Sequence, residues 1–370
     1  MRLVILCLLA VSFSISWCIT RWMKSFAVAI GFVDQPGGRK VHADAKPLGG
    51  GIGIFWGLAL PIIAGLGYLT FAEPHEFLRR AVSGPIDAYW SGARLQTHLA
   101  WEILLAGAGI HILGLWDDRK PLGPFFKLFV QLLVITALVL AANLRILTFL
   151  DHAIPGGNVV SAIVTVLWIA AVTNAFNFLD NMDGLSAGVA SICTTAFLFA
   201  TLSIGQWFVA AGLALLLGSM LGFLWHNFPP AKIFMGDSGS LLIGLILGTL
   251  TVRTTYLAPD ARFQNHWYAV LAPVIILALP LYDLLVVSTI RLLRGKSPFV
   301  GDTNHFSHRL VARGMSRRTA VLCLYLVAAA TSIAAVMLPH VSGDVAILIF
   351  VQTILILSMV ALLEQHPLPR

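Results

Sequence analysis

Charge is what this sequence lacks most. Only 11% of its 370 residues are Asp, Glu, Lys or Arg, whereas an ordinary soluble domain carries about 25%. In contrast, 58% are hydrophobic and the mean hydropathy is +0.87. No soluble fold of this length hides so much apolar side chain, so the composition excludes a soluble globular protein. It predicts an all-α, polytopic membrane protein whose solvent is largely lipid.

Cysteine is scarce as well, with four residues and no CxxC pair. Cys7, Cys18, Cys193 and Cys323 all fall inside apolar runs. This pattern favours buried thiols that pack as small hydrophobes over a metal or redox site. Low-complexity stretches and repeats of fixed period are also absent, so we interpret residues 1–370 as one membrane domain.

Apolar runs, by contrast, are abundant. A helix needs about 17–25 mostly apolar residues to cross a bilayer, and eleven runs predict such a span. They lie at about 3–20, 49–71, 99–116, 125–143, 158–178, 185–204, 206–225, 239–257, 267–290, 319–338 and 343–363. The first run could pass for a secretory signal, but its basic flank follows it, at Arg21 and Lys24. A cleaved signal has the opposite bias, so we expect an uncleaved helix.

The basic residues predict the orientation in the membrane. With the N-terminus outside and the C-terminus in the cytoplasm, most of the 24 Lys and Arg residues face inward, as the positive-inside rule requires. The net charge of +7 therefore implies no nucleic-acid partner. The expected location is the inner (plasma) membrane. Five polar segments then share the cytoplasmic face, namely 34–48, 117–127, 174–184, 226–237 and 291–318. We therefore predict one site on that face. The external segment 72–98 predicts a surface helix without chemistry.

The stretch "NAFNFLDNMDGLSAG", residues 174–188, places oxygen-bearing side chains at the end of a span. Asn177, Asp180 and Asp183 follow each other at i, i+3 intervals, so a helical turn would present them on one side. Gly184 permits close approach or a break. Such hard ligands suit Mg²⁺. A structural role is the alternative, but carboxylates at a membrane edge without a nearby lysine need an external cation.

The stretch "LGLWDDRKPLGPFFKLFVQ" contains the adjacent carboxylates Asp117 and Asp118. They repel each other unless a cation or a shared proton lies nearby. The alternative is a solvated helix end that pairs with the basic residues after it. Lys127 shares a helical face with Gln131 and either snorkels to the interface or reaches an anionic ligand.

Two further stretches carry candidate ligands. In "WHNFPPAKIFMGDSGSLLIG", Asp237 either binds a cation or caps the helix that follows. Asn227 and Phe234 precede it, and the ring of Phe234 could stack on a flat base. In "RLLRGKSPFVGDTNHFSHRLVARGMSRR", no third N or S ligand accompanies His305 and His308. Anion binding therefore fits this loop better than zinc.

Two other polar features are an aspartate within a predicted span and a basic loop between the first two spans. Asp283, within the ninth span, is interpreted as a helix anchor or structural pair rather than a catalytic group. The loop "DQPGGRKVHADAKPLGGG" is basic and rich in glycine. It either admits a phosphate closely or serves as a flexible linker.

Aspartates, oxygen ligands and basic residues gathered on one face resemble a site for phosphoryl transfer from a nucleotide to a membrane substrate. Five motifs then carry a resemblance to a known family over about residues 31–320. They are "DQPGGRKVH…PLGG", "DDRKPLGPFFKLFVQ", "NAFNFLDNMDGLSAG", "NFPPAKIFMGDSGS" and "RGKSPFVGDTNHFSHRL". In this order they resemble the polyprenyl-phosphate N-acetylhexosamine-1-phosphate transferases (glycosyltransferase family 4), in the WecA/TagO branch, to which the MraY translocases are related.

Two positions depart from the family pattern. Asn181 stands where Gly is common, and Ser307 replaces the middle His of a His-x-His-His loop. The loop also lacks the triple-His-Glu pattern of the MraY translocases, which weighs against a muramoyl-pentapeptide substrate.

The resemblance implies that a polyprenyl (undecaprenyl) phosphate attacks a UDP-N-acetylhexosamine, with UDP-GlcNAc as the default donor. The products are UMP and a lipid-linked sugar for cell-envelope polysaccharides. The expected cofactor is Mg²⁺, with Mn²⁺ as a substitute. The residues assigned to catalysis are Asp117, Asp118, Asp180, His305 and His308; those assigned to substrates are Arg39, Lys40, His42, Lys127, Asp183, Asn227 and Phe234; those assigned to the metal are Asp237, Asn177 and Asp180.

Within this hypothesis, Asp117 takes the residual proton of the lipid phosphate and Asp118 stabilises that arrangement. The alternative from another class is a membrane transporter, which predicts polar residues at mid-membrane and an inverted repeat. A CDP-alcohol phosphotransferase would need a DGxxAR-type motif, and the sequence has none. The oligomeric state stays open, with a homodimer as one expectation.

Overall fold

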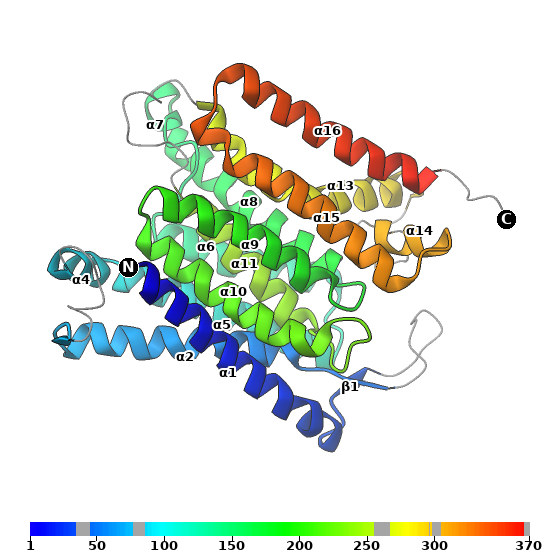
Figure 1. The fold of residues 1–370 in the computed structure, drawn as a ribbon, viewed down its shortest axis with the longest axis horizontal. Coiled ribbons are helices and arrows are strands. Elements are labelled where there is room, and N and C mark those ends of the chain that lie inside the picture. The colour runs from blue at the N-terminus through cyan, green and yellow to red at the C-terminus, as the bar shows by residue number, and fades with distance from the viewer. Residues whose placement is uncertain (35–44, 77–85, 255–266, 296, 298–304, 366–370) are drawn as a thin grey trace.

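The computed structural model describes residues 1–34, 45–76, 86–254, 267–295, 297 and 305–365. Nearly all of the described chain is helical (Figure 1). The helices are α1 (Arg2–Ala29), α2 (Gly50–Phe71), α4 (Ile86–Leu95), α5 (Thr97–Arg119), α6 (Pro124–Ala141), α7 (Leu150–Ala153), α8 (Gly157–Leu179), α9 (Leu185–Ser203), α10 (Trp207–Asn227), α11 (Asp237–Arg253), η2 (Trp267–Leu271), α12 (Ala272–Ile276), α13 (Ala278–Leu293), α14 (Phe306–Ala312), α15 (Arg317–Val336), η3 (Leu338–His340) and α16 (Gly343–Gln365).

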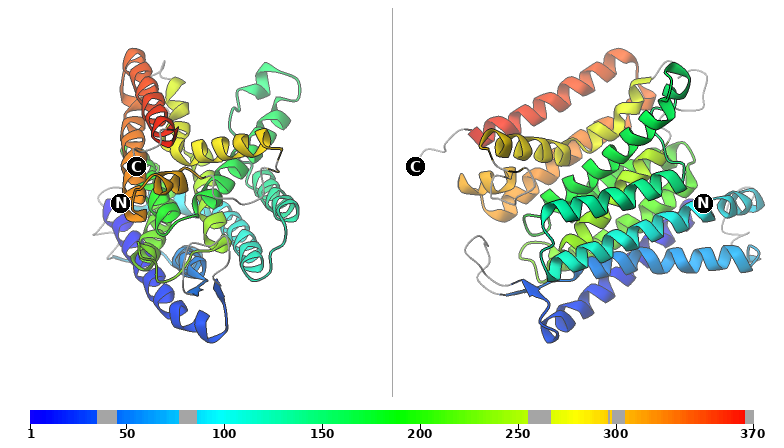
Figure 2. Two further views of the ribbon diagram at one scale, coloured as in Figure 1. Left: turned by 90° about the vertical axis from the view of Figure 1, so that its right-hand side faces the viewer. Right: turned by 180° about the vertical axis from the view of Figure 1, so that it is seen from behind.

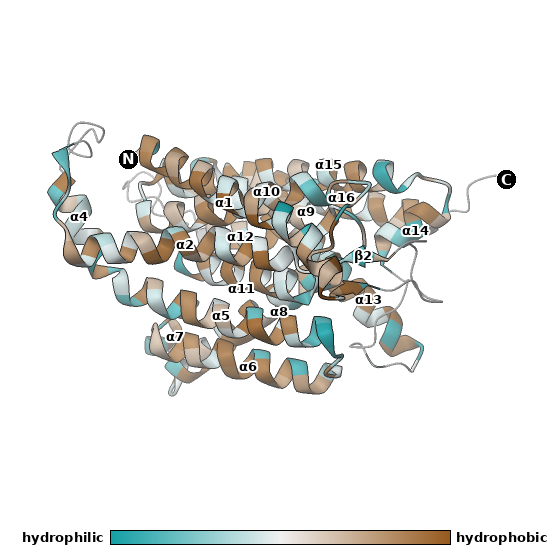
Figure 3. Ribbon diagram, turned by 90° about the horizontal axis from the view of Figure 1, so that it is seen from below, coloured by the Kyte–Doolittle hydropathy of each residue, from teal (hydrophilic) through white to brown (hydrophobic). Residues whose placement is uncertain are grey.

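The long helices form one bundle with two distinct ends. Figure 1 shows α14 and the small sheet at one end, and α4 and α7 at the other, and the views in Figure 2 agree. The sheet pairs β1 (Val33–Asp34) with β2 (Lys46–Pro47) in antiparallel register. Hydrophobic residues cover the lengths of the helices, while α4 and parts of the bundle ends are hydrophilic (Figure 3). The all-α membrane fold predicted from composition is therefore found, apart from this two-stranded sheet.

Nine helices in the described chain are long and apolar enough to cross a bilayer: α1, α2, α5, α6, α8, α9, α10, α15 with η3, and α16. The bent pair Tyr268–Ile276 and Ala278–Leu293, which comprises most of η2 together with α12 and α13, would provide a tenth. Helix α11 has 17 residues, which is at the short limit of the range of about 17–25 for a span. The chain is thus a multi-pass membrane protein, while the count of eleven spans stays a prediction.

The ninth predicted span, residues 267–290, is wrong as one straight helix. It is broken between Ile276 and Ala278 and bends by 68°. The cause lies in Pro280, which lacks a backbone N–H and clashes with the carbonyl four residues earlier, at Ile276. The bend separates α12 from α13, which carries Asp283.

Helix α11 lies at the centre of the bundle. Every residue from Ser238 to Thr251 is buried, as expected for a helix that is apolar on all sides. It packs against α8, α5 and α2. At Gly244 an added Cβ would come within 2.5 Å of the Cα of Thr173, so small residues allow the two backbones to approach closely. This packing brings Asp237, the first residue of α11, among the ends of its neighbours.

The four cysteines are free, but only Cys193 is fully buried. Cys7 and Cys18 are exposed and Cys323 is half-buried, so the prediction of buried thiols is wrong for the first two. The reason is that α1 turns one apolar side away from the bundle, where a thiol meets lipid rather than protein.

Candidate active site

Contacts between distant segments bring the predicted polar loops together at the α14 end of the bundle. The N–H of Gly50 donates to the carbonyl of Phe234 (2.9 Å), which joins the start of α2 to the loop before α11. Asp118 contacts Asp237, and Ser307 contacts Asn181. The predicted convergence is therefore found wherever the structure describes these loops. Arg39, Lys40 and His42 lie outside the described residues.

Lys127, at the start of α6, bridges two carboxylates. Its Nζ lies 3.2 Å from Oδ2 of Asp117 and also donates to Oδ2 of Asp237. The other oxygen of Asp117 accepts from the N–H of Leu122 (2.8 Å), which fixes the turn between α5 and α6. Lys127 thus points into the acidic cluster, and the interpretation of it as a lysine that snorkels to the interface is wrong.

Asp118 caps the buried helix α11. Its Oδ1 accepts from the N–H of Asp237 (2.7 Å) and its Oδ2 from the N–H of Ser238 (3.2 Å). Gly236 precedes them with φ +74°, and a Cβ there would come within 2.4 Å of the Asp118 carboxylate. An anion at a helix N-terminus satisfies its unpaired N–H groups and its dipole. Because Asp118 is the cap, the alternative of Asp237 as a self-cap is wrong.

Helix α5 holds the start of α11 at two further points. The ring of His111 stacks on Phe55 with 4.5 Å between centroids, and its Nδ1 lies 3.0 Å from the carbonyl of Ser238. At Gly114 an added Cβ would approach the Cα of Ser238 to 2.4 Å. Residues 111, 114 and 118 share one helical face, so together they grip the segment 237–238. His111 was not among the predicted site residues, although a histidine within an apolar run was an available signal.

The turn between α8 and α9 separates the three residues that the i, i+3 spacing placed on one helix. Helix α8 ends at Leu179 and the backbone leaves the helix at Asp180, so that interpretation is wrong. Asn177 donates to Oδ1 of Asp237 (2.9 Å), whereas Asp183 accepts from the N–H of Ala231 (2.9 Å). Asn177 therefore faces the carboxylate cluster, and Asp183 faces the loop before α11.

Asp180 has a carboxylate that receives no hydrogen bond from the described residues, although it is partly buried. Burial, and then the carboxylates of Asp237, Asp118 and Asp183, raise the pKa of Asp180 well above its ordinary value. Crowded carboxylates of this kind are stabilised by a cation. In the described ranges, no three His, Cys, Asp or Glu side chains meet closely enough to hold a metal by themselves. Mg²⁺ takes one or two carboxylates and completes its shell with water and phosphate, so a magnesium ion held by Asp180 and Asp237 stays a prediction.

Asn227 joins the loop that carries Phe234 to the turn between α8 and α9. Asn227 is 4% exposed, accepts from the N–H of Gly184 (2.8 Å) and donates to the carbonyl of Ile233 (2.9 Å). From α15, the hydroxyl of Tyr325 donates to the carbonyl of Gly184, a contact that the sequence did not indicate. Asn227 thus acts as a brace here. A contact between uridine and Asn227 or Phe234 stays a prediction.

The histidine loop is anchored to α13. Nδ1 of His305 lies 2.8 Å from Oδ2 of Asp283, and the N–H of Phe306 donates to the other oxygen (3.3 Å). Asp283 is fully buried, so it acts as the anchor that its position predicted. The ring centroids of His305 and His308 lie 6.4 Å apart. The roles of both histidines stay predictions.

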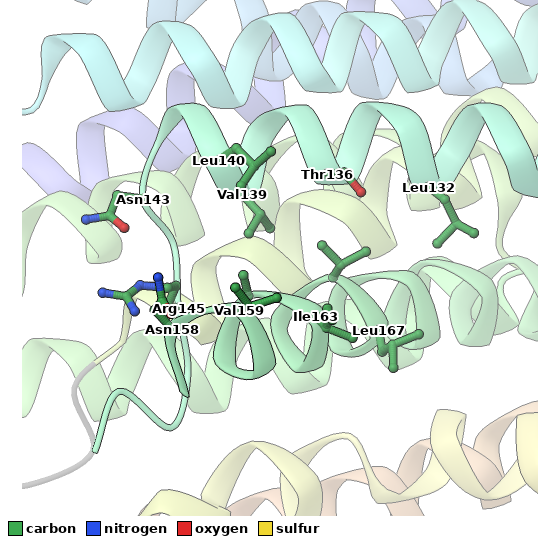
Figure 4. A pocket seen from close by; sticks show the side chains of 12 residues that line it. Leu132, Thr136, Val139, Leu140, Asn143, Arg145, Asn158, Val159, Ile163 and Leu167 are labelled. Atoms are coloured by element: carbon green, nitrogen blue, oxygen red, sulfur yellow. The ribbon is translucent and has the colours of Figure 1, made fainter. Parts of the chain in front are cut away.

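An apolar crevice of about 620 Å³ runs between α6 and α8. Figure 4 shows Asn143, Arg145 and Asn158 at one end of it, and Leu132 and Leu167 at the other. A smaller cavity of about 40 Å³ continues the seam between these helices towards the acidic cluster. It is lined by Pro124, Lys127, Leu128, Gln131, Asn174, Asn177 and Phe178.

The close packing of α5 against the start of α11 gives the first testable prediction. Gly114→Ala places a Cβ against the backbone of Ser238, which cannot move aside as a flexible side chain would. Overpacking of this kind costs about 1–3 kcal/mol, so the unfolding temperature in detergent should fall by several degrees. Gly109→Ala is the matched control, because its Cβ meets Val134 at an ordinary 3.6 Å. Equal unfolding temperatures for the two variants would contradict the close contact.

Comparison with known proteins places the chain among enzymes. Residues 100–255 match the profile of glycosyl transferase family 4. The chain is 32% identical over 349 residues to the probable undecaprenyl-phosphate N-acetylglucosaminyl 1-phosphate transferase of Bacillus subtilis, which covers 94% of this chain and 87% of that protein. It is 31% identical over 331 residues to the decaprenyl-phosphate N-acetylglucosaminephosphotransferase of Mycolicibacterium smegmatis (84% and 76%).

A third relative is the undecaprenyl-phosphate alpha-N-acetylglucosaminyl 1-phosphate transferase of Yersinia pestis, at 28% identity over 316 residues (83% and 76%). The matches to these three relatives cover most of each chain. The resemblance is thereby confirmed, and the chain belongs to glycosyl transferase family 4, among the polyprenyl-phosphate N-acetylhexosamine-1-phosphate transferases.

Proposed function

We propose that this protein transfers N-acetylglucosamine-1-phosphate from UDP-N-acetylglucosamine to a polyprenyl phosphate and releases UMP. The three relatives described above are named for N-acetylglucosamine transfer to undecaprenyl or decaprenyl phosphate. The observation that carries the proposal for this chain is the unpaired carboxylate of Asp180 beside Asp118 and Asp237. That cluster lies at one end of a membrane bundle, where a soluble donor and a lipid acceptor can meet.

The metal site consists of Asp180 and Asp237, supported by the amide of Asn177. The donor set fits Mg²⁺, or Mn²⁺ as its substitute, because it offers hard oxygen ligands and leaves positions for water and phosphate. When bound, the ion neutralises charge on the diphosphate and on the leaving UMP. Lys127 balances part of the acidic charge and is in position to contact phosphate oxygens.

The lipid phosphate fits the small cavity beside Lys127. There the Nε2 of Gln131 is buried and has no hydrogen-bond partner among the described residues, whereas its Oε1 accepts from Asn174. An unpaired buried donor costs free energy, and a phosphate oxygen at this point would satisfy it. Asp117, linked to the same lysine, accepts the residual proton of the monoester.

Direct displacement is the expected reaction. The second pKa of a phosphate monoester is about 6, so the lipid phosphate is mostly a dianion at neutral pH. One of its oxygens forms the new bond to the β-phosphorus of the donor. The bond from that phosphorus to the bridging oxygen breaks, and UMP leaves with the electron pair. On the donor side, Asp183 and Phe234 hold the uridine while His305 and His308 orient the diphosphate or sugar.

The isoprenoid chain lies along the crevice between α6 and α8. Both cavities lie between α6 and α8. A lipid whose phosphate lies beside Lys127 would therefore extend its isoprenoid chain into the apolar crevice of about 620 Å³. The protein lies in the inner membrane, and its active site faces the cytoplasm. Eleven spans, with the N-terminus outside and the C-terminus inside, complete this proposal.

A transporter is not supported, because the relatives are named as transferases. Its expected signature, polar groups at mid-membrane in two halves of the chain, also differs from a cluster at one end of the bundle.

The proposal is tested by UMP release from a panel of UDP-hexosamines, with purified protein, polyprenyl phosphate and Mg²⁺. UDP-GlcNAc should give the fastest release, and removal of divalent ions by a chelator should abolish it. Asp117→Asn and Asp237→Asn should each lower kcat at least about 100-fold, because they remove a proton acceptor and a metal ligand. Asp344→Asn, an exposed carboxylate at the start of α16, should stay within about twofold of the native protein. Failure of every UDP-hexosamine would overturn the proposal.

If the isoprenoid chain lies in the crevice between α6 and α8, a substitution there should affect long acceptors more than short ones. Ile163→Trp fills the crevice, so the KM for a long polyprenyl phosphate should rise about tenfold or more, whereas a short prenyl phosphate should be used as before. Leu133→Trp is the control, because Leu133 is 60% exposed on α6 and does not line the crevice. An equal effect on both chain lengths would argue against this groove.

The orientation predicts which residues a membrane-impermeant maleimide reaches in a variant without native cysteines. Lys232→Cys, in the loop before α11, should react only after the cells are permeabilised. His152→Cys, in α7 at the other end of the bundle, should react in intact cells. The reverse pattern would place the acidic cluster outside and contradict a cytoplasmic donor.

A further inference from the structure

The two positions at which the chain departs from the family pattern contact each other. The hydroxyl of Ser307 donates to Oδ1 of Asn181 across 126 residues of sequence. Ser307 is fully buried, so water does not compete for this bond. The amide of Asn181 also donates to the carbonyl of Phe178 (2.7 Å), so both of its polar atoms are engaged and its orientation is fixed.

We propose that Asn181 and Ser307 form a positioning pair. The pair sets α14, with His305 before it and His308 within it, against the acidic turn between α8 and α9. This inference rests on the proposed function, because His305 and His308 are assigned there to the donor diphosphate or sugar. Asn181 follows Asp180 directly, and Ser307 lies between the two histidines. The bond therefore joins the metal side of the site to the histidine side.

Helix α14 depends on such contacts for its position. It has seven residues, and isolated helices shorter than about 12–15 residues are marginal in water. Asp283 holds the first histidine from α13, and the ring of His305 meets the edge of Phe178 with 5.8 Å between centroids. The hydrogen bond from Ser307 to Asn181 ties α14 directly to the turn after α8.

The pair is also complementary in size. Asn with Ser fills a volume similar to that of Gly with His, the residues of the family pattern, and volume-conserving exchanges are the ones that packed interiors tolerate best. A histidine alone at 307 would collide with the side chain of Asn181. A glycine alone at 181 would leave the buried hydroxyl of Ser307 without its partner.

A double-mutant cycle on the full-length protein tests the pair. Asn181→Ala and Ser307→Ala should each lower kcat for UMP release about tenfold, because each leaves a buried polar partner unsatisfied. The KM for UDP-GlcNAc should change less than about twofold. The double variant should be no slower than the slower single one, since both substitutions remove the same bond. Asn181→Gly with Ser307→His should recover most of the kcat that either substitution alone removes.

Ser316→Ala is the control for a purely structural effect. Ser316 caps α15 by accepting from the N–H of Thr319 (3.1 Å), so its loss should lower the unfolding temperature without changing kcat. If the effects of Asn181→Ala and Ser307→Ala multiply to about 100-fold, or if only the unfolding temperature changes, the positioning role is wrong. A native protein that releases no UMP would overturn the proposed function instead. Unfolding temperatures of the four proteins of the cycle would then decide whether the two residues are coupled, and additive shifts would overturn the pair.

Discussion

The hydrogen bonds from the start of α11 to Asp118 are the interaction on which the site depends. Helix α11 is buried from Ser238 to Thr251, so its first N–H groups need an acceptor within the protein, because an unsatisfied buried donor is costly. Asp118 provides the acceptor from α5 (2.7 and 3.2 Å). Because the cap comes from another helix, the side chain of Asp237 need not turn back on its own backbone. It faces Lys127 and Asn177 instead, and the core helix thereby delivers a carboxylate to the site.

The balance of charge at this end is the reason why the proposed function includes a cation. Lys127 lies between Asp117 and Asp237, which leaves Asp180 without a basic partner among the described residues. Burial and the surrounding carboxylates raise the pKa of Asp180, the change expected where the charged form lacks compensation. In the proposed reaction, a divalent ion would compensate the negative charge of the carboxylates and of the donor diphosphate together. This makes metal and donor binding mutually supportive in the proposed reaction.

The sequence predicted the features that depend on local pattern. Apolar runs indicated the helices, and the order of polar loops indicated one site at one end. Features that depend on tertiary contact were out of reach. Nothing near Asp237 in sequence shows that its helix is capped by Asp118, and the spacing of Asn177, Asp180 and Asp183 assumed a helix that stops at Leu179. The break before Pro280 was readable, because proline disrupts the preceding turn.

A site built at helix ends also explains why so many of its polar residues do no chemistry. Helix termini leave backbone N–H and C=O groups unpaired, and loops between spans must satisfy them with side chains. Asn227 and Tyr325 do so for Gly184, and Asp183 does so for Ala231. A polar residue at this end is therefore a poor candidate for chemistry when all of its polar atoms are committed to the backbone. By that criterion, Asp180 and Lys127 are the strongest candidates for contact with the substrates of the proposed reaction, while Asp118 and Asn227 hold the surrounding backbone in place.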